Sequence, residues 1–299
     1  MNHLHPLFNN SFRAAVERIV SDYRGSPWEL REFRDMNELS SHPSAILSNG
    51  SYSVFVKLGT AANGLKQFET ELAGLSLLSE LSGVLIPTSI GIFPAGGGVV
   101  MILEGVQAVD RTPKQWREIG QTLAQIHQNK GQQFGLNTQN YFGPFYQDNR
   151  PLQDWPTFYA ERRLWPRFMG AINAGHLPTE IIWQVEKLIL RIPKLCDSDV
   201  VPTLLHGDAQ QHNFISTAEG AVVIDPAVYY GHPEMDLAYV DFFHPVPDDL
   251  FLGYKEVLPI DSGFEGRREL WRIYGYLAVV EAGDNSYLPT LVDAVRKYL

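Results

Sequence analysis

One short segment in the last third of the chain constrains the fold more than any other. It reads Leu205-His206-Gly207-Asp208, then a polar loop that ends at Asn213, then an apolar run that closes at Asp225. The turn signals between the apolar runs predict loop, strand, turn and strand, with Asn213 opening the hairpin and Asp225 closing it. Both side chains are therefore expected to face one point beside Asp208.

Phosphoryl transfer needs the residue types that stand at positions 208, 213 and 225, namely Asp208, Asn213 and Asp225. One carboxylate orients the attacking hydroxyl and accepts its proton, and a carboxamide and a second carboxylate hold Mg²⁺ on the phosphates of a nucleotide. We therefore expect Asp208 to be the catalytic base, and Asn213 and Asp225 to be the magnesium ligands. The alternative makes them ordinary loop and turn residues. That alternative is weaker because the spacing of the three residues and the predicted pattern of strands and turns around them both fit the phosphoryl-transfer site.

The residues after Asp225 resemble a known family. The run Asp225–Ala238, which contains Tyr229-Tyr230-Gly231-His232, is similar to the fructosamine kinase (ketosamine-3-kinase) family, part of the wider group with the aminoglycoside phosphotransferase fold. Two further segments agree with it, Asp154–Leu164 with its Trp-Pro-Thr-Phe run and Leu123–His127. The resemblance extends from about Val54 to the C-terminus.

The resemblance implies an enzyme that uses ATP and Mg²⁺ to phosphorylate a sugar hydroxyl of a ketosamine. The acceptor would be a small ketosamine or amino sugar of the fructosamine or ribulosamine type, and glycated protein lysines are further candidates. Phosphorylation at the 3-hydroxyl would destabilise the adduct and release the amine, a repair reaction. Two alternatives stay open: a kinase of an aminoglycoside, choline or homoserine type of acceptor, and a catalytically inactive nucleotide-binding scaffold.

The periodicity of apolar residues predicts an α+β fold of the two-lobed, protein-kinase-like kind. Residues 28–60 have the alternation of β-hairpins, with a turn at Ser48-Asn49-Gly50, and Val99–Leu103 reads as a further strand. Helical spacing begins near residues 11, 68, 113, 181 and 270, and Pro193 is expected to end the fourth of these helices. We expect a nucleotide-binding N-lobe over residues 1–104. The C-lobe, over 105–299, would carry the catalytic loop and the acceptor site.

Lys57 is the candidate for the phosphate-binding lysine. It lies in Val54-Phe55-Val56-Lys57-Leu58, a pattern that places such a lysine on a strand of the N-lobe. By family position, Glu71 in the following helix is expected to pair with it, whereas Glu69 points about 200° away and faces solvent. The alternative is an exposed lysine at the end of a strand, with both glutamates on the surface.

Two further nucleotide-binding segments match less closely. Val100–Val106 resembles the strand and linker whose backbone binds adenine, although a plain buried strand has the same pattern. Asp35–Pro43 contains no glycine, whereas the family's loop is glycine-rich so that backbone amides approach the phosphates. The residues assigned to the nucleotide on these grounds are Leu103, Glu104, Val106, Ser40 and Ser41.

The catalytic loop departs from the family between its two fixed residues. Ala209-Gln210-Gln211-His212 stands where the family has Leu-Trp-Ser-Gly, so the core chemistry is expected to survive while the wall beside the acceptor changes. His206 and Asp236 are expected to support the loop rather than react. The aromatic and polar candidates for the acceptor site, each of which also fits a core position, are Trp155, Tyr229, His232 and Trp271.

Composition favours an intracellular enzyme. The net charge is −10 and the chain has no basic run, which argues against a nucleic-acid partner. Its single cysteine, Cys196, excludes an internal disulfide and fits a reducing compartment. The start resembles no secretory signal, and the apolar runs are far shorter than the ~18 residues of a membrane span. We expect a cytoplasmic protein with no membrane or zinc site; the sequence leaves the oligomeric state open.

Overall fold

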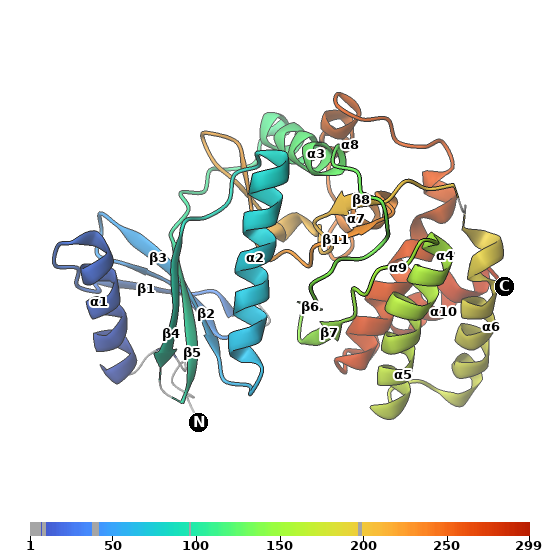
Figure 1. Ribbon diagram of the computed structural model, residues 1–299, viewed down its shortest axis with the longest axis horizontal. Coiled ribbons are helices and arrows are strands. Elements are labelled where there is room, and N and C mark those ends of the chain that lie inside the picture. The colour runs from blue at the N-terminus through green and yellow to red at the C-terminus, as the bar shows by residue number, and fades with distance from the viewer. Residues whose placement is uncertain (1–6, 8–9, 38–41, 96, 197–198) are drawn as a thin grey trace.

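The computed structural model describes residues 7, 10–37, 42–95, 97–196 and 199–299. The first part of the chain forms one antiparallel sheet with strand order β1-β2-β3-β5-β4. Helices α1 (Asn10–Arg24) and α2 (Gly64–Ser82) lie on its two sides, and α2 separates it from the helical part (Figure 1). The five strands are β1 (Glu32–Asp35), β2 (Ser44–Ser48), β3 (Ser53–Gly59), β4 (Ser89–Ala95) and β5 (Gly98–Glu104).

Strand alternation sorts the residues of β3 between the two helices. Val54 and Val56 pack in the core that contains the buried face of α1, whereas Phe55 packs with Phe68 of α2. Because side chains along a strand alternate between faces, Lys57 shares the face of Phe55 and points toward α2. The period that builds the sheet therefore also places the lysine.

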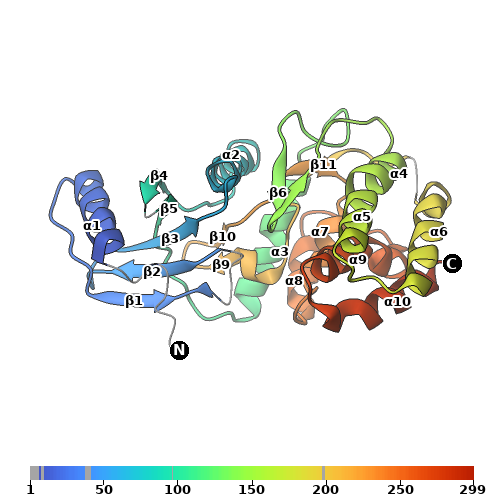
Figure 2. The same cartoon turned by 90° about the horizontal axis from the view of Figure 1, so that it is seen from below.

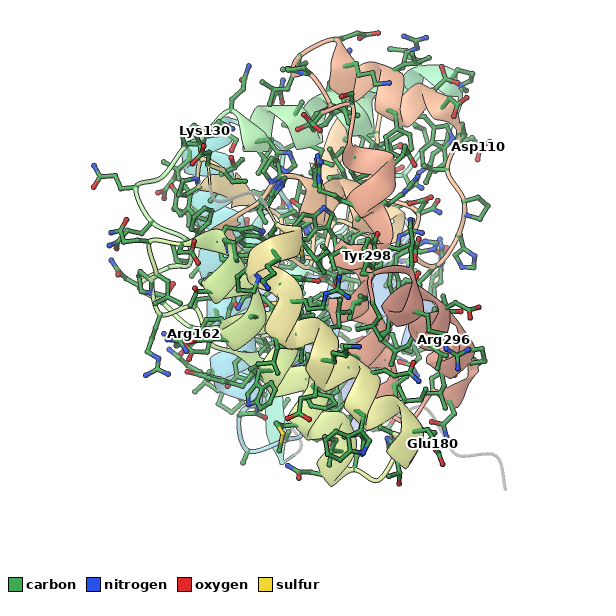
Figure 3. All side chains as sticks on the ribbon, turned by 90° about the vertical axis from the view of Figure 1, so that its right-hand side faces the viewer. Asp110, Lys130, Arg162, Glu180, Arg296 and Tyr298 are labelled. Atoms are coloured by element: carbon green, nitrogen blue, oxygen red, sulfur yellow. The ribbon has the colours of Figure 1, made fainter. Side chains whose placement is uncertain are left out.

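The remainder of the chain is mainly helical, and the long helix α9 lies at its centre. Its buried residues, Trp271 among them, join one large core that also contains Trp155 and Tyr159. In Figure 3, which views this part from the end away from the sheet, α6 lies in front and Glu180 marks its beginning. The helices are α3 (Pro113–His127), α4 (Trp155–Phe158), a π-helical segment (Tyr159–Leu164), α5 (Trp165–Asn173), α6 (Thr179–Leu195), α7 (Glu234–Tyr239), α8 (Asp248–Lys255), α9 (Phe264–Glu281), a 3₁₀ turn (Asn285–Tyr287) and α10 (Leu288–Lys297).

The end of α6 differs from the expectation. The helix continues through Pro193 to Leu195 instead of ending at the proline. Proline keeps a helical φ, and in the last turn it removes a single backbone hydrogen bond, so the cost is small there. The other predicted elements are present, and the predicted α+β class is confirmed.

Three short antiparallel strand pairs lie between the sheet and the helices (Figure 2). The strand that leads into the catalytic loop pairs with a strand just after Asp225. The strand that follows the loop pairs with the strand that ends just before Asp225. A 3₁₀ turn (Gln211–Asn213) closes the loop. The three pairs are β8 (Thr203–Leu205) with β11 (Tyr229–Gly231), β9 (Phe214–Ser216) with β10 (Ala221–Val223), and β6 (Asn140–Phe142) with β7 (Phe145–Gln147).

The segment between β5 and α3 connects the sheet to the helical part and is fixed at both ends. Gly105 N–H donates to the Ser53 carbonyl at 2.8 Å, and Val109 N–H donates to the Ser216 carbonyl at 2.8 Å. A Cβ at position 105 would lie 2.1 Å from Ser53 Oγ, so only glycine allows this approach.

In the described part of the chain, every helix is too short or too polar to cross a membrane.

Candidate active site

Asp236 and His206 hold the catalytic loop. The Asp236 carboxylate, in the first turn of α7, accepts hydrogen bonds from His206 N–H at 2.7 Å and Gly207 N–H at 2.9 Å. The His206 ring bonds through Nε2 to the Ile224 carbonyl at 2.9 Å. At Gly207, φ is +83° and a Cβ would lie 2.0 Å from the Ala227 carbonyl oxygen, so glycine is required. The supporting roles expected for His206 and Asp236 are confirmed.

Asn213 and Asp225 lie opposite each other on the β9–β10 hairpin. Phe214 pairs with Val223, and Ile224 N–H donates to the Asn213 carbonyl at 3.0 Å. Asn213 Nδ2 donates to the Asp208 carbonyl at 2.8 Å. Because that carbonyl can only accept, the amide orientation is fixed and Asn213 Oδ1 points away from it.

Asp225 has an unusual backbone. Its φ of +52° makes it the one non-glycine residue with a positive φ in the described chain. Such a conformation costs of order 1 kcal/mol and persists where the surroundings impose it, often at functional sites. Here it turns the carboxylate toward Lys57 immediately after the strand.

The ion pair expected between Lys57 and Glu71 is present, and Asp225 joins it. Lys57 Nζ lies 2.9 Å from Glu71 Oε1, and it also contacts Asp225 Oδ1. Burial alone would raise the pKa of Asp225, but the lysine ammonium outweighs burial and holds that pKa below its ordinary value. Burial raises the pKa of Glu71, against the pull of Lys57. Glu69, as predicted, points elsewhere and is 3.5 Å from Lys66 at the surface.

Asp208 has an environment suited to a general base. Burial, followed by the charge of the neighbouring Asp225, raises the pKa of Asp208 to about 7. The Gln210 side chain donates to its carboxylate over a long distance of 3.5 Å. A carboxyl group with a pKa near neutrality accepts a proton more readily than an ordinary aspartate.

A cleft of about 430 Å³ opens at Asp208, Asn213 and Asp225. A smaller pocket of about 70 Å³ adjoins it, shares Asp208, Asp225 and Gly143 with it, and contains Lys57 and Glu71. The structure thus brings together all five polar residues of the predicted phosphoryl-transfer set. The other residues that line the larger cleft are Phe142, Gly143, Pro144, Phe145, Gln210, His212, Phe243, His244, Ala278, Val279 and Ala282.

The four residues predicted for the acceptor walls lie elsewhere, which contradicts that prediction. Trp155, Tyr229 and Trp271 are buried in the helical core, and Trp271 Nε1 donates to Glu234 at 2.7 Å. The ring of His232 packs on Trp271, with 4.9 Å between the ring centroids. None of the four lines the cleft at Asp208. Their aromatic character serves packing, the more frequent role of such residues.

The predicted adenine-binding segment occupies the end of β5 and the linker. Glu104 N–H donates to the Thr88 carbonyl at 2.9 Å, and its carboxylate accepts from Tyr52 Oη at 2.8 Å. The Glu104 side chain is therefore already hydrogen-bonded to a residue of the same sheet part, residues 1–104. Nucleotide contacts of Leu103, Glu104 and Val106 remain predictions, and Ser40 and Ser41 lie outside the described residues.

Sequence reasoning missed several residues of this site. The Arg111 guanidinium donates to the carbonyls of Gln211 (2.8 Å) and Phe214 (2.5 Å), so it fixes the 3₁₀ turn that carries Asn213. His244 packs against His212 across the cleft wall, with 5.4 Å between ring centroids. Neither residue belongs to a local motif. Among the site residues that were not predicted, only the aromatic residues on both sides of Gly143-Pro144 lie in a recognisable local sequence pattern, that of a hairpin tip.

The donor set at the hairpin suits Mg²⁺. The amide oxygen of Asn213 and the carboxylate of Asp225 are hard oxygen ligands, and Mg²⁺ prefers one or two protein oxygens with the remaining positions left to phosphates and water. The fixed Asn213 amide presents oxygen rather than nitrogen toward the cleft side.

Comparisons with known proteins agree with this geometry. The fructosamine kinase family model matches residues 12–299. The ketosamine-3-kinase of mouse is 30% identical over 251 residues, which are 75% of this chain and 81% of that one. A solved structure of a proposed fructosamine-3-kinase from Thermobifida fusca is 28% identical, with a TM-score of 0.80 over 95% of this chain and 98% of that chain.

A choline kinase from Streptococcus pneumoniae, 15% identical with a TM-score of 0.63 over 95% of this chain and 100% of that chain, shares the fold alone. The protein therefore has the two-lobed, protein-kinase-like fold of small-molecule kinases. Within that class, it belongs to the fructosamine kinase family.

Proposed function

We propose that this protein transfers the γ-phosphoryl group of ATP to the 3-hydroxyl of a ketosamine. The observation that carries the proposal is the convergence of Lys57, Asp208, Asn213 and Asp225, from three separate segments, at two adjoining pockets that share Asp208 and Asp225. Membership of the fructosamine kinase family supports the acceptor class. The mouse relative is a ketosamine-3-kinase, which supports the 3-hydroxyl as the position.

The side chains divide the reaction between them. Asp208 orients the acceptor hydroxyl and takes its proton as the oxygen bonds to the γ-phosphorus, and the bond from that phosphorus to ADP breaks. Lys57, held by Glu71, neutralises phosphate oxygens of the nucleotide. Asn213 and Asp225 would hold Mg²⁺, which supplies charge neutralisation on the phosphates. The sheet part, residues 1–104, would bind the nucleotide, and residues 105–299 the acceptor.

The larger cleft is the proposed acceptor site. Gln210, His212 and His244 offer hydrogen-bonding groups to sugar hydroxyls, and Phe142, Phe145 and Phe243 offer apolar faces. Glycated protein lysines are included among the proposed acceptors. With one cysteine, which is buried, the protein would be suited to the cytoplasm.

ADP release against a panel of acceptors tests the proposal. Purified protein would be assayed with ribulosyl-, erythrulosyl- and fructosyl-lysine, and in parallel with an aminoglycoside, choline and homoserine. We expect turnover with at least one ketosamine and none with the other acceptors. Turnover with choline or an aminoglycoside alone would reassign the acceptor, and Mg-ADP binding without turnover on any compound would contradict the enzymatic role.

A further inference from the structure

One wall of the larger cleft is the last turn of helix α9. Ala278, Val279 and Ala282 line the cleft there. Ala278 and Ala282 are four residues apart and lie on the same face of the helix, and their small side chains leave room above it. Phe142, at the tip of the β6–β7 hairpin, packs on Tyr274, one turn before Ala278, with 4.8 Å between ring centroids. The wall of the cleft is therefore apolar along α9 and at the hairpin tip.

The other phenylalanine of the hairpin tip is tied to the end of α9 by a largely buried ion pair. The guanidinium carbon of Arg167 lies 4.4 Å from the ring centroid of Phe145, and Arg167 is only 8% exposed. Arg167 Nη1 lies 2.9 Å from Oε2 of Glu281, the residue before Ala282. A Cβ at position 170 would lie 2.0 Å from Glu281 Oε1, so Gly170 leaves the space that this carboxylate occupies. The pair thus holds Phe145 beside the last turn of α9.

The carboxylates of the cleft belong to the phosphoryl-transfer residues alone. Among the described residues that line it, only Asp208 and Asp225 carry a carboxylate, and none is a lysine or an arginine. Burial lowers the pKa of His212, so its ring is uncharged at neutral pH. The wall formed by α9 and the hairpin tip therefore offers apolar contact to an acceptor, but no partner for a further positive charge.

This wall discriminates between two kinds of amine. An ammonium group placed against it would lose water and gain no counter-charge, which is costly. An alkyl chain placed there would bury apolar surface, which is favourable. The ketosamine of a lysine side chain presents a run of methylenes next to the sugar-bearing nitrogen, whereas an aminoglycoside presents several ammonium groups.

We propose that the last turn of α9 and the hairpin tip bind the substituent on the ketosamine nitrogen and select an uncharged alkyl chain. Ala282 is the specificity-determining residue, because it is exposed whereas Ala278 is buried, so a longer side chain at position 282 can reach a bound substituent without disturbing the core. The inference rests on the proposed function, since it takes a ketosamine as the acceptor, and it adds which amines that ketosamine carries.

Two acceptors that differ only at the end of the amine test this inference. Ribulosyl-hexylamine ends in a methyl group, and ribulosyl-cadaverine has the same length but ends in an ammonium group. With the full-length protein and saturating Mg-ATP, kcat/KM for the hexylamine adduct is expected to exceed that for the cadaverine adduct by about tenfold. ADP release gives both values.

Ala282→Glu is expected to lower this ratio by about tenfold, because its carboxylate would attract the ammonium group and displace the alkyl chain. Ala174→Glu is the matched control. Ala174 ends α5 as Ala282 ends α9, with φ of −74° against −69°, and it is also exposed. It does not line the cleft, so this variant should keep the wild-type ratio.

Three results would overturn the inference: a wild-type ratio of one or less, an unchanged ratio in Ala282→Glu, or the same change in both variants. The last would show a general effect of an added charge. Failure of the proposed function looks different. A protein that turns over neither of these adducts nor ribulosyl-methylamine, whose amine is too short to reach the wall, would contradict both proposals, whereas turnover of all three without preference would contradict the inference alone.

Discussion

Asp208 has opposite effects on catalysis and on stability. Its carboxyl group is shielded from water beside another carboxylate, and the hydrogen bond that it accepts from the Gln210 side chain is long, at 3.5 Å. These conditions make it a competent base and also make its charged form unfavourable in the folded protein. Two predictions follow from this one environment.

The first concerns the pH dependence of turnover. Asp208 must be deprotonated to accept the hydroxyl proton, and its pKa in the free enzyme is about 7. Below that pH, kcat/KM for the acceptor is expected to fall by about tenfold per unit. Steady-state rates at saturating Mg-ATP from pH 5 to 9 would check this. A profile that stays flat down to pH 5 would show that a group with an ordinary aspartate pKa, or no base, is involved.

The second concerns stability. The folded pKa of Asp208 is raised from its ordinary 3.8 to about 7, so its charged form costs stability that is fully felt above pH 7 and disappears as the pH falls toward 4. Asp208→Asn should therefore stabilise the protein at pH 8 by roughly 1–2 kcal/mol, after a discount for partial exposure. The gain should shrink at pH 5. Asp225→Asn is the matched control, because it removes the partner of a buried lysine and should destabilise. Denaturant unfolding with the same sign for both variants would refute the account.

His212 gives a prediction about acceptor choice. It lines the cleft where the family pattern has glycine, and its neighbour His244 lines the same wall. His212→Gly should reduce the preference for ketosamines with more sugar hydroxyls, because an imidazole that can bond them is removed. The ratio of kcat/KM for fructosyl-lysine to that for erythrulosyl-lysine should change several-fold, while KM for ATP stays constant. Equal losses on both acceptors would exclude a role in discrimination.

At the scale of elements, a buried polar network ties the π-helical segment to the residues after Asp225. The Arg163 guanidinium lies 4.0 Å from the Tyr229 ring centroid, and Nη2 donates to Asn149 Oδ1 at 2.6 Å. Asn149 Nδ2 donates to Asn140 Oδ1 at 3.0 Å, and Asn140 Nδ2 to the Val228 carbonyl at 2.8 Å. The network thus anchors the β6–β7 hairpin, whose tip lines the cleft, to the segment just after Asp225, the proposed metal ligand.

Arg163→Lys should therefore be far from conservative. An ammonium cannot both stack on the ring and bond the amide in the geometry of a guanidinium, and its burial would be uncompensated. We expect a loss of roughly 2–4 kcal/mol in unfolding free energy. Arg162→Lys is the control. Arg162 is the next residue, its side chain is 19% exposed, and Figure 3 labels it. Its replacement should cost about 0.5 kcal/mol or less. Similar losses for the two variants in chemical denaturation would contradict the network's role.

Local patterns were sufficient for the elements and for the positions of the proposed active-site residues. Alternation in β3 placed Lys57, the spacing within the catalytic loop placed Asp208 and Asn213, and the hairpin after it placed Asp225, because each depends on a short stretch of chain. The acceptor walls could not be found in this way. Trp155 and Trp271 have the residue type of a sugar-binding wall, yet three-dimensional packing buries both in the core. His244 and Arg111 reach the site only through tertiary structure, and no local signal marks either.

At the scale of the whole molecule, the site exists only where the two parts of the chain meet. Lys57 and Glu71 come from the sheet and α2, whereas Asp208, Asn213 and Asp225 come from hairpins at the edge of the helical part (Figures 1 and 2). The junction is held by the contact of Lys57 with Asp225, by the bond from Val223 N–H to the Leu85 carbonyl at 2.8 Å, and by the linker at Gly105. Catalysis therefore requires the relative position of the parts as well as their residues.

The position of the new phosphate on the product tests the central claim most directly. Wild-type protein and Asp208→Asn would each be incubated with Mg-ATP and ribulosyl-lysine, and the products analysed by phosphorus and carbon NMR. We predict a single phosphate on the oxygen of carbon 3 with the wild-type protein, and no product with a variant that still binds Mg-ADP. A phosphate on another hydroxyl, or undiminished turnover by Asp208→Asn, would contradict the assignment of this cleft.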